Sequence, residues 1–535
     1  MLSPLDVIRR YPAHDQTLSG LLASRGVHRP WHPLLHRGAQ TLTYAAFAAR
    51  VDGAAHALHA RGIAAGDRVG VMAPNSLNTV VLLFALARLG AVFVPVNPDF
   101  GASEARYIFQ HAGVCAVATT PSAHATAFDA VATLRPAPWS LLLEGTRGDL
   151  DLPNFDALID AAPDTALPQP ATPDSTVLML YTSGTTGFPK GVMHSQRNFV
   201  LAGEGFVARM WLQPDDRLMC ILPMFHINAL FYSLAGTLAA GASLVLEPKF
   251  SASTFWRTAA EAGATQVNII AAIGNILARR PREEFDPRHR LRVIYGAPIS
   301  PDLERTFREE FQVPVMIEGY GMTEIPGACN NPFDGERRPN SMGLPARHPD
   351  PSVTFAALRV VDDDGVDVAD GSEGELWVRT PILMQGYYKD AEQTAASMHE
   401  GWFKTGDLVR RDTDGYFYFV ARKKDIIRRR GENLSGAEID RVVEDHPAVV
   451  RCAAIPVPSD LGEDEILVAI TVKPGASPSA EEIAEWCRAR LAAIKVPRYV
   501  LFVDALPTTA TERVQKFQLR ADKTLRARAT DLQGS

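Results

Sequence analysis

Apolar and polar positions alternate along the first part of the chain as they do in folds where strands and helices follow one another. An alanine-rich helical pattern runs from residue 43 to about 61, and residues 66–72 follow as a turn and a buried strand. Residues 82–89 read as a second helix that ends at Gly90, and residues 91–96 as a second strand. This order predicts an α/β domain with a parallel sheet, and we expect residues 1–40 to add a helix and a strand that cap its core.

A connector precedes one further strand: residues 161–173 are rich in Ala, Pro and Asp and indicate an exposed segment that leads into a buried strand at 176–180.

The end of the chain has the pattern of a separate small domain. Residues 416–420 alternate as a strand, and residues 438–520 alternate helix and strand patterns over the length of a small α+β domain. Since 535 residues are too many for one core, we expect two or three domains.

Composition adds several exclusions. The chain is 46% apolar and 21% charged, as in proteins that fold in water, and no uninterrupted apolar run reaches the length of about 18 residues that a membrane helix needs. The N-terminus lacks the features of a secretion signal, so we expect the cytoplasm. Five scattered cysteines favour reduced thiols over disulfides or zinc. A net charge of −7 without a basic face argues against nucleic acid as a partner.

Residues 181–191, with the sequence Tyr-Thr-Ser-Gly-Thr-Thr-Gly-Phe-Pro-Lys-Gly, concentrate glycines, hydroxyls and one lysine after the strand at 176–180. The polar segment 192–198 is compatible with a helix, so we predict a strand, a glycine-rich loop and a helix. Glycines allow backbone N–H groups to approach phosphate oxygens, and a lysine adds a full positive charge. The P-loop of NTPases is excluded by spacing, because Phe-Pro-Lys follows the second glycine. An ordinary Gly/Ser/Thr surface loop is the alternative.

The stretch closely resembles the signature of the adenylate-forming superfamily, which comprises acyl-CoA synthetases, stand-alone adenylation domains and luciferases. The resemblance covers roughly residues 40–520 and five motifs in the family order. It implies a large α/β N-terminal domain of layered sheets and helices, residues 1–421, and a small mobile α+β domain, residues 422–535. It also implies that the phosphates of ATP are bound by Thr182, Ser183, Gly184, Thr185, Thr186, Gly187 and Lys190.

Further motifs give the resemblance its acyl and adenine sites. Phe225 and His226 match the aromatic-histidine pair at the mouth of the acyl pocket, although a lone histidine in an apolar run is more often a core residue. Asn228 is then a candidate for the pocket wall. The resemblance implies two segments along the adenine and acyl groups, which are read as strand ends that open into loops: Tyr295, Gly296, Ala297 and Pro298, and Gly319, Tyr320 and Gly321.

The resemblance also assigns the phosphate, ribose and hinge positions. Thr323 would contact phosphate and Glu324 would help to hold Mg²⁺, unless the pair is only a helix cap. Asp407 would accept both ribose hydroxyls, and Arg422 would contact ribose or phosphate. Lys424 stands at the hinge between the two domains. Gly431 and Glu432 belong to the loop that presents backbone to the pantetheine arm of CoA. The basic run 422–430 is either an electropositive face for phosphates or a solvated surface.

The sequence departs from the family pattern near its end. There the family has a lysine that bridges the carboxylate and the α-phosphate during adenylation, and Arg513 stands in its place. Arg513 keeps the charge with different geometry, and Glu512 replaces a glycine. Lys516 is the possible substitute, although on an extended chain it would face away from Arg513.

These features predict an AMP-forming acyl-CoA ligase. It uses ATP with Mg²⁺ to convert a small carboxylic acid to an acyl-adenylate and passes the acyl group to CoA. Residues 330–332, 341–343 and 431–435 loosely resemble carnitine/crotonobetaine-type CoA ligases. Gly321 and Tyr295 together suggest a short-to-medium or compact cyclic acid, and we expect a monomer or homodimer. The alternatives are an adenylating enzyme that loads a carrier protein and a catalytically silent nucleotide-binding relative.

Overall fold

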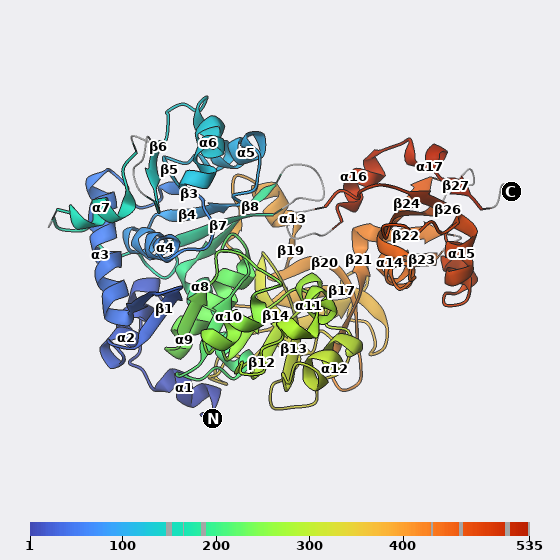
Figure 1. The fold of residues 1–535 in the computed structure, drawn as a ribbon, viewed down its shortest axis with the longest axis horizontal. Coiled ribbons are helices and arrows are strands. Elements are labelled where there is room, and N and C mark those ends of the chain that lie inside the picture. Colours follow the sequence, from blue (N-terminus) through green and yellow to red (C-terminus); the bar gives the residue numbers. More distant parts are fainter. Residues whose placement is uncertain are drawn as a thin grey trace. The chain divides into compact units, whose positions relative to one another are not determined.

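The computed structural model has the predicted mixed α/β architecture (Figure 1). It describes residues 1–145, 152–163, 165–182, 189–429, 432–458, 464–508 and 514–532, without the side chains of Lys424, Glu432 and Asn433. The α-helices and short helices are as follows: α1 Pro4–Arg9, α2 Leu18–His28, α3 Tyr44–Ala60, α4 Leu77–Leu89, α5 Ala102–Ala112, α6 Pro121–Val131, α7 Phe155–Asp160, α8 Gln196–Met210, the π-helix η1 Asn228–Leu234, α9 Ala235–Ala240, α10 Phe255–Glu261, α11 Ala271–Arg279, η2 Arg282–Glu284, α12 Pro301–Glu309, α13 Ala391–Ala396, η3 Lys423–Asp425, α14 Gly436–Glu444, α15 Ala480–Arg488, η4 Ala493–Lys495, α16 Lys516–Ala521 and α17 Leu525–Arg528.

Two large sheets hold most of the strands. The seven-stranded sheet has the order β18 (Gly386–Tyr387), β8 (Lys190–Ser195), β7 (Thr176–Thr182), β4 (Val92–Val96), β3 (Arg68–Met72), β5 (Ala116–Thr119) and β6 (Trp139–Leu142). The nine-stranded sheet has the order β15 (Leu344–Pro345), β14 (Ile325–Asn330), β13 (Val315–Met322), β12 (Val293–Gly296), β11 (Gln266–Asn268), β9 (Arg217–Cys220), β10 (Ser243–Leu246), β1 (Pro33–Arg37) and β2 (Gln40–Thr43).

The remaining strands form smaller sheets. Five strands pair in the order β16 (Ala357–Val361), β17 (Glu373–Arg379), β20 (Trp402–Arg411) and β19 (Met398–His399), with β21 (Phe417–Arg422) also paired to β20. Near the C-terminus, β24 (Val449–Pro458), β25 (Asp464–Val472), β26 (Tyr499–Phe502) and β27 (Thr530–Asp531) form a four-stranded sheet, and β22 (Ile426–Arg429) pairs with β23 (Glu432–Ser435). Helices α14, α15 and α16 complete the α+β character predicted for residues 438–520.

The central strands of the seven-stranded sheet are buried on both faces. Along β4, Val92, Val94 and Val96 pack with Phe109 of α5 in one apolar cluster, while Phe93 belongs to the main core. Because neighbouring side chains of a strand point to opposite faces, both faces of the sheet must be covered. The continuous apolar run 91–96 therefore has the pattern of a parallel strand buried between layers, as predicted.

Most predicted elements of the N-terminal part are confirmed. The helix expected at 43–61 is α3, the strand after Gly66 is β3, and the helix that ends at Gly90 is α4. Gly90 has φ of 71°, the left-handed conformation that ends a helix. Local sequence was sufficient here because caps, turns and apolar periodicity agree.

The helix predicted directly after the glycine-rich loop was wrong. Residues 190–195 form the strand β8, which pairs antiparallel with β7 from Thr182↔Lys190 to Thr176↔Ser195. The helix α8 begins only at Gln196, with Ser195 as its N-cap. The loop therefore joins two strands of a hairpin, so a helix N-terminus does not follow it directly. Apolar Val192 is fully buried, which favoured pairing in the sheet over an early helix.

The chain divides into two compact units. The first comprises residues 1–182, 189–358 and 378–403, and the second includes residues 359–377 and 404–535. The boundary expected between residues 421 and 422 stays a prediction. None of the helices in the described ranges is long and apolar enough to cross a membrane.

Candidate active site

The two strands that flank the glycine-rich loop are anchored by helix α5. His111 Nδ1 lies 2.7 Å from the Tyr181 hydroxyl, on the strand that enters the loop. One turn earlier, the Tyr107 hydroxyl donates to the Pro189 carbonyl at 3.1 Å, where the chain leaves the loop. Residues four apart lie on the same face of a helix. A single helical face therefore holds both ends of the predicted phosphate loop, although neither residue was predicted.

A tyrosine links the predicted phosphate lysine to the predicted metal ligand. The Tyr387 hydroxyl donates to Glu324 Oε1 at 2.8 Å, and the Lys190 ammonium lies 5.1 Å from the centre of the Tyr387 ring. Burial raises the pKa of Tyr387, and the neighbouring Glu324 carboxylate raises it further, so the phenol keeps its proton. Tyr387 thus orients the Glu324 carboxylate, which is 8% exposed.

Thr323 and Glu324 form the turn between β13 and β14. We had expected residues 318–324 to be a strand end that opens into a loop, but β13 runs through Met322 and pairs with β14, so this expectation was wrong. The alternative of a helix cap is wrong for the same reason. Buried His194 Nε2 donates to the Thr323 carbonyl at 2.7 Å, and its Nδ1 lies 3.1 Å from the Asn198 amide nitrogen. Burial lowers the pKa of His194 to about 4, so the ring is neutral and holds the turn.

Glycine is required at two positions of β13. A Cβ at Gly319 would lie 2.8 Å from the Tyr295 hydroxyl, and a Cβ at Gly321 would lie 2.7 Å from the Tyr232 hydroxyl. Both distances are shorter than carbon–oxygen contact allows. The two tyrosines therefore lie directly against the strand that also carries Tyr320. Tyr232 occupies space beside Gly321 that the sequence suggested was open.

The strand end at Gly296, Ala297 and Pro298 is confirmed, since β12 ends at Gly296. The next residue, Ile299, makes a backbone hydrogen bond to the Glu318 carboxyl group, which links this segment to β13. Burial raises the pKa of Glu318 to about 8, with a smaller opposing effect of the Ile299 hydrogen bond. Glu318 is therefore mostly protonated near neutral pH.

Phe225 and His226 follow β9 in a segment that Asn75 anchors. The Asn75 side chain donates to the Leu222 carbonyl at 2.9 Å and accepts from the Met224 amide at 2.8 Å. The Phe225 and His226 rings lie 4.6 Å apart. The pair is thus held immediately before the π-helix η1, an element often found at functional sites.

Asn228 and Tyr295 are connected through Asn268. Asn268 Nδ2 donates to Asn228 Oδ1 at 2.9 Å, and Asn268 pairs in register with Tyr295 on the adjacent strand. Asn268 also donates to Ser233 Oγ of the π-helix at 3.0 Å. These contacts bring together residues that the sequence proposed separately for the acyl pocket.

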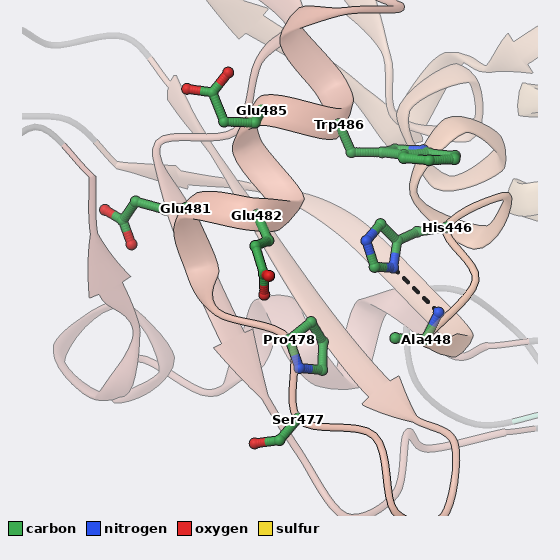
Figure 2. A pocket seen from close by; sticks show the side chains of 8 residues that line it. All are labelled: His446, Ala448, Ser477, Pro478, Glu481, Glu482, Glu485 and Trp486. Carbon is green, nitrogen blue, oxygen red and sulfur yellow. Dashed lines mark hydrogen bonds between the residues drawn. The ribbon is translucent and has the colours of Figure 1, made fainter.

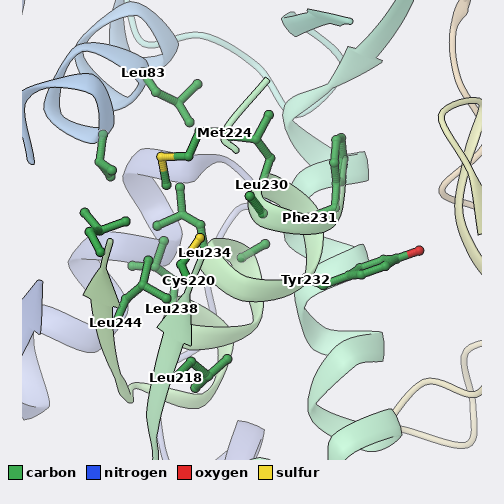
Figure 3. Close-up of a cluster of buried hydrophobic side chains, with 14 of the residues drawn as sticks. Leu83, Leu218, Cys220, Met224, Leu230, Phe231, Tyr232, Leu234, Leu238 and Leu244 are labelled. Atoms are coloured by element: carbon green, nitrogen blue, oxygen red, sulfur yellow. The ribbon is translucent and has the colours of Figure 1, made fainter. Parts of the chain in front are cut away.

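The side chains of the π-helix η1 point in two directions. Leu230, Leu234 and Tyr232 all belong to the main buried cluster with Leu218 and Cys220 of β9, and the Tyr232 ring points away from Leu218 and Cys220 (Figure 3). The Tyr232 ring stacks on Phe206 at 5.3 Å and meets Tyr295 edge-on at 5.4 Å. Tyr295 is only 3% exposed, and burial raises its pKa. The rings of Tyr232 and Tyr295 therefore pack against each other beside Gly319 and Gly321.

The predicted ribose site lies in the second unit. Asp407 is fully buried and pairs in register with Arg422, whose Nε is 2.9 Å from Asp407 Oδ1. Gly406 has φ of 69°, a conformation that favours glycine, and its amide donates to Glu375 Oε1 at 3.1 Å. Asp407 and Arg422 thus come together, as expected if both contact one nucleotide.

Three basic residues of the run 422–430 that the structure describes have acidic partners inside the second unit. Lys423 Nζ lies 2.8 Å from Asp363 and 3.3 Å from Glu375. Arg429 Nη2 lies 2.8 Å from Glu465. With the pair of Arg422 and Asp407, these ion pairs compensate the positive charges of Arg422, Lys423 and Arg429. Whether the rest of the run is an electropositive face for phosphates or a solvated surface stays a prediction.

Lys516 is held in an ion pair with Asp440. It is the first residue of α16, and Val514 before it forms an antiparallel bridge with Thr508. Because Arg513 lies outside the described residues, the side on which it stands relative to Lys516 stays a prediction. Burial raises the pKa of Asp440, which the positive charge of Lys516 partly opposes. Because both residues belong to the second unit, their pair is part of its interior.

Several predicted residues fall outside the part of the chain that the structure describes. They are Ser183, Gly184, Thr185, Thr186, Gly187, Gly431 and Arg513, together with the side chains of Lys424 and Glu432. Their roles stay predictions.

Within the described ranges, no three His, Cys, Asp or Glu side chains come together as a metal site. Among the residues predicted for the phosphate site, Glu324 offers a single carboxylate, and a single carboxylate can bind Mg²⁺ jointly with nucleotide phosphates. A hollow of about 590 Å³ in the second unit is lined by Glu481, Glu482, Glu485, His446 and Trp486 (Figure 2), none of which is a predicted site residue. A hollow of about 630 Å³ in the first unit includes Tyr387 in its wall.

Comparison with known proteins also places the chain among adenylate-forming enzymes. Residues 23–388 match the model of the AMP-binding enzyme family, and residues 438–513 match that of the AMP-binding enzyme C-terminal domain. The chain is 35% identical over 517 residues to a sulfoacetate–CoA ligase of Cupriavidus necator, covering 96% of this chain and 99% of the relative. It is 32% identical to an oxalate–CoA ligase of Arabidopsis thaliana, covering 94% and 98%.

Among solved structures, ATP-bound MatB of Rhodopseudomonas palustris superposes with a TM-score of 0.83 at 28% identity, covering 94% of this chain and 98% of that one. The family match spans well over half of the residues, and the curated relatives exceed 30% identity over nearly the whole length. The chain belongs to the AMP-binding enzyme family, that is, to the adenylate-forming superfamily.

Proposed function

We propose that this protein is an ATP-dependent acyl-CoA ligase that activates a short carboxylic acid. In the first half-reaction, a carboxylate oxygen of the acid attacks the α-phosphate of ATP. An acyl–AMP anhydride forms and pyrophosphate leaves. In the second, the CoA thiolate attacks the acyl carbon, the thioester forms and AMP leaves. The relatives named as CoA ligases and the match of both family regions support this assignment.

The first half-reaction depends mainly on binding and on positive charge near the phosphates. Lys190 and the loop that begins at Thr182 bind phosphate, and Glu324 holds the ion that accompanies ATP. Mg²⁺, when bound, offsets negative charge on the phosphates. The observation that carries the proposal is the arrangement of Lys190, Tyr387 and Glu324, which supplies a cation and an oriented carboxylate.

Asp407 accepts hydrogen bonds from the ribose hydroxyls, and Arg422 contacts the same part of the nucleotide. Asp407 is suited to this role because it is ionisable, fully buried and already oriented by Arg422. Arg513 stabilises charge at the α-phosphate. Support for Arg513 over Lys516 is indirect: the Lys516 ammonium already has Asp440 as its partner.

The second half-reaction requires the small domain, residues 422–535, to rotate about Lys424. Gly431 and Glu432 then present backbone to the pantetheine arm. A change from Lys424 to Pro would fix φ and should abolish thioester formation while adenylate formation continues. We further propose that the chain is related to the carnitine/crotonobetaine-type CoA ligases within the superfamily.

The acid is short or compact. Two relatives named above act on short acids, sulfoacetate and oxalate, by their names. Tyr295 and Tyr232 support the same choice here, because both lie against the glycines of β13. Replacement of Tyr295 by Gly should extend activity toward longer acids. A wild-type optimum at palmitate or at acetate would contradict the proposed acid class.

The test is acid-dependent exchange of labelled pyrophosphate into ATP, with wild type, Glu324→Gln and Tyr387→Phe. Glu324→Gln should reduce exchange on the order of 100-fold or more, since it removes a charged ligand of the phosphate site. Tyr387→Phe should reduce it less, because the carboxylate remains but loses its orienting hydrogen bond.

Three other results would each overturn part of the proposal. If wild type binds ATP but catalyses no pyrophosphate exchange with any acid, the protein is a catalytically silent relative. Exchange without CoA thioester would indicate a carrier protein as acceptor. Full exchange by Glu324→Gln would remove Glu324 from the site.

A further inference from the structure

Arg209 is a buried cation without a counterion. It lies on α8 and is 3% exposed. Its Nε and Nη1 atoms have no hydrogen-bond partner, and no ion pair involves it, among the residues that the structure describes. A guanidinium offers five N–H donors and no acceptor, so only acceptors from its surroundings can satisfy it. Burying a charge without a partner is unfavourable.

Aromatic rings compensate the charge only in part. The Arg209 guanidinium carbon lies 4.9 Å from the Tyr232 ring centre, 5.4 Å from that of Tyr295 and 5.6 Å from that of Phe206. Ring faces attract cations but do not satisfy N–H donors. The Nε and Nη1 donors of the guanidinium are therefore not satisfied by the described residues around them.

The nearest acidic side chain on the same helix is already used. Glu204 lies 3.2 Å from His14 and 3.0 Å from His348. Glu318, on the strand next to Tyr295, is mostly protonated near neutral pH because burial raises its pKa to about 8. By contrast, Arg25, which is equally buried, donates to Ser24 and to the carbonyls of Leu238 and Ala239.

The guanidinium lies beside residues that the sequence assigned to the acyl pocket. A Cβ at Gly327 would be 1.9 Å from Arg209 Nη2, so only a glycine leaves room for the guanidinium beside β14. Gly327 in turn faces Gly321, since a Cβ at Gly321 would lie 2.7 Å from the Gly327 nitrogen. Arg209 is therefore contiguous with Gly321, Tyr232 and Tyr295. Figure 3 shows the Tyr232 ring directed away from Leu218, Cys220 and Leu244.

We propose that Arg209 binds a second anionic group, a carboxylate or a sulfonate, at the far end of a short acid whose other carboxylate is activated. This inference rests on the proposed function and narrows its substrate class to short dianionic acids. The acid brings the negative charge that the fold does not supply, and the rings exclude water from the ion pair.

The test compares acids that differ at one end. Malonate and sulfoacetate carry a second anion, and monomethyl malonate has a neutral ester in its place. AMP release is measured with ATP and CoA for the full chain, Arg209→Met and Arg209→Lys. Arg305→Met, which changes an exposed arginine of α12, is the control.

Wild type should prefer at least one of the two dianions over monomethyl malonate on the order of 100-fold in kcat/KM, the scale of a charged hydrogen bond in a dry site. Arg209→Met should lose most of this preference, Arg209→Lys should keep part of it, and Arg305→Met should keep it all. The relative rates with malonate and sulfoacetate show whether the site fits a planar carboxylate or a tetrahedral sulfonate.

A second readout does not depend on catalysis. Malonate or sulfoacetate should raise the thermal midpoint of wild type, and this rise should be absent in Arg209→Met. Activity with monomethyl malonate or propanoate but not with dianions would overturn the inference and leave the ligase function standing. A preference or a thermal rise that survives Arg209→Met would also overturn it. If no acid yields AMP, the ligase function fails, and the thermal readout alone decides whether Arg209 binds the anion.

Discussion

Arg429 and Arg209 are buried to the same degree, in surroundings of opposite kind. Arg429 is 4% exposed, its Nη2 lies 2.8 Å from Glu465, and its Nη1 donates to the carbonyls of Ile494 and Val496 at 2.7 and 2.9 Å. Arg209 is 3% exposed and has neither a carboxylate nor a carbonyl acceptor within the described ranges. The first is compensated by the small unit itself, and the second only by aromatic rings.

This difference separates a structural charge from one that is available to a ligand. A buried ion pair that loses one member leaves the other charge uncompensated in a medium of low polarity. A buried charge that never had an internal partner imposes its cost on the free protein, and a ligand of opposite charge removes that cost. The four predictions below test this distinction, beginning with the largest expected effect.

Replacing Arg429 by Met should lower the free energy of unfolding by about 3–5 kcal/mol, because Glu465 would be left buried and unpaired. The matched change Arg209→Met should alter the free energy of unfolding by no more than about 1–2 kcal/mol, since lost ring contacts are offset by the removal of an unpaired charge. Denaturant unfolding of both variants measures the difference. Equal destabilisation would mean that Arg209 is as structural as Arg429.

Replacing Lys516 by Ala should destabilise the small unit by about 2–3 kcal/mol, because Asp440 loses its cation in a partly buried site. Arg513→Ala should leave stability unchanged and slow pyrophosphate exchange, while thioester formation from supplied acyl-adenylate continues. Unfolding and exchange are measured on both variants. If Lys516→Ala abolishes exchange and Arg513→Ala does not, the catalytic cation is Lys516.

Replacing Asp407 by Ala should weaken ATP binding by on the order of 1.5–3 kcal/mol, because a charged acceptor for two hydroxyls is lost. Asp407→Asn keeps the shape without the charge and should lose part of that affinity. Calorimetric titration with ATP measures both. Unchanged affinity in Asp407→Ala would leave the buried pair with Arg422 as a purely structural feature.

Glu318 is the acidic counterpart of Arg209, a half-buried carboxyl group that no ion pair of the described residues involves. Its pKa is raised from 4.5 to about 8, so the folded state keeps a proton that the unfolded state loses. Stability attributable to Glu318 is therefore complete below pH 4.5 and falls as pH rises toward about 8.

The variant Glu318→Gln removes this titration. Relative to wild type, it should gain at least about 1 kcal/mol between pH 5 and pH 9. Thermal unfolding across that pH range measures the gain. A difference between the two proteins that does not change with pH would show that Glu318 titrates alike in both states.

Local sequence predicted the strands and helices whose signals lie within a few residues. The helix α4, with a serine cap and Gly90 at its end, is one example, and the strand β7 is another. The strand β8 was missed because its identity depends on pairing with β7 and β18 on either side, and such pairing lies outside any local window.

In the candidate site, too, some residues could be predicted from the sequence and others depend on contacts that only the fold creates. The motif residues Glu324 and Asp407 could be proposed from family resemblance, but Tyr387 could not, since it lies 63 residues from Glu324 and no local pattern connects them. Arg209 gave no distinct signal in the sequence, because α8 also carries Arg197 and Glu204. Whether that charge has a partner depends on side chains from η1, β12 and β14, which only the fold brings together.

The central claim is that a carboxylate oxygen of the acid attacks the α-phosphate of ATP. It is tested most directly with an acid whose carboxylate oxygens are ¹⁸O, incubated with ATP, CoA and the full chain. One acid oxygen should appear in each AMP, because the bridging oxygen of the acyl-adenylate leaves with AMP when the thiol attacks the acyl carbon. AMP without label, or label in pyrophosphate or free phosphate, would contradict an adenylate intermediate.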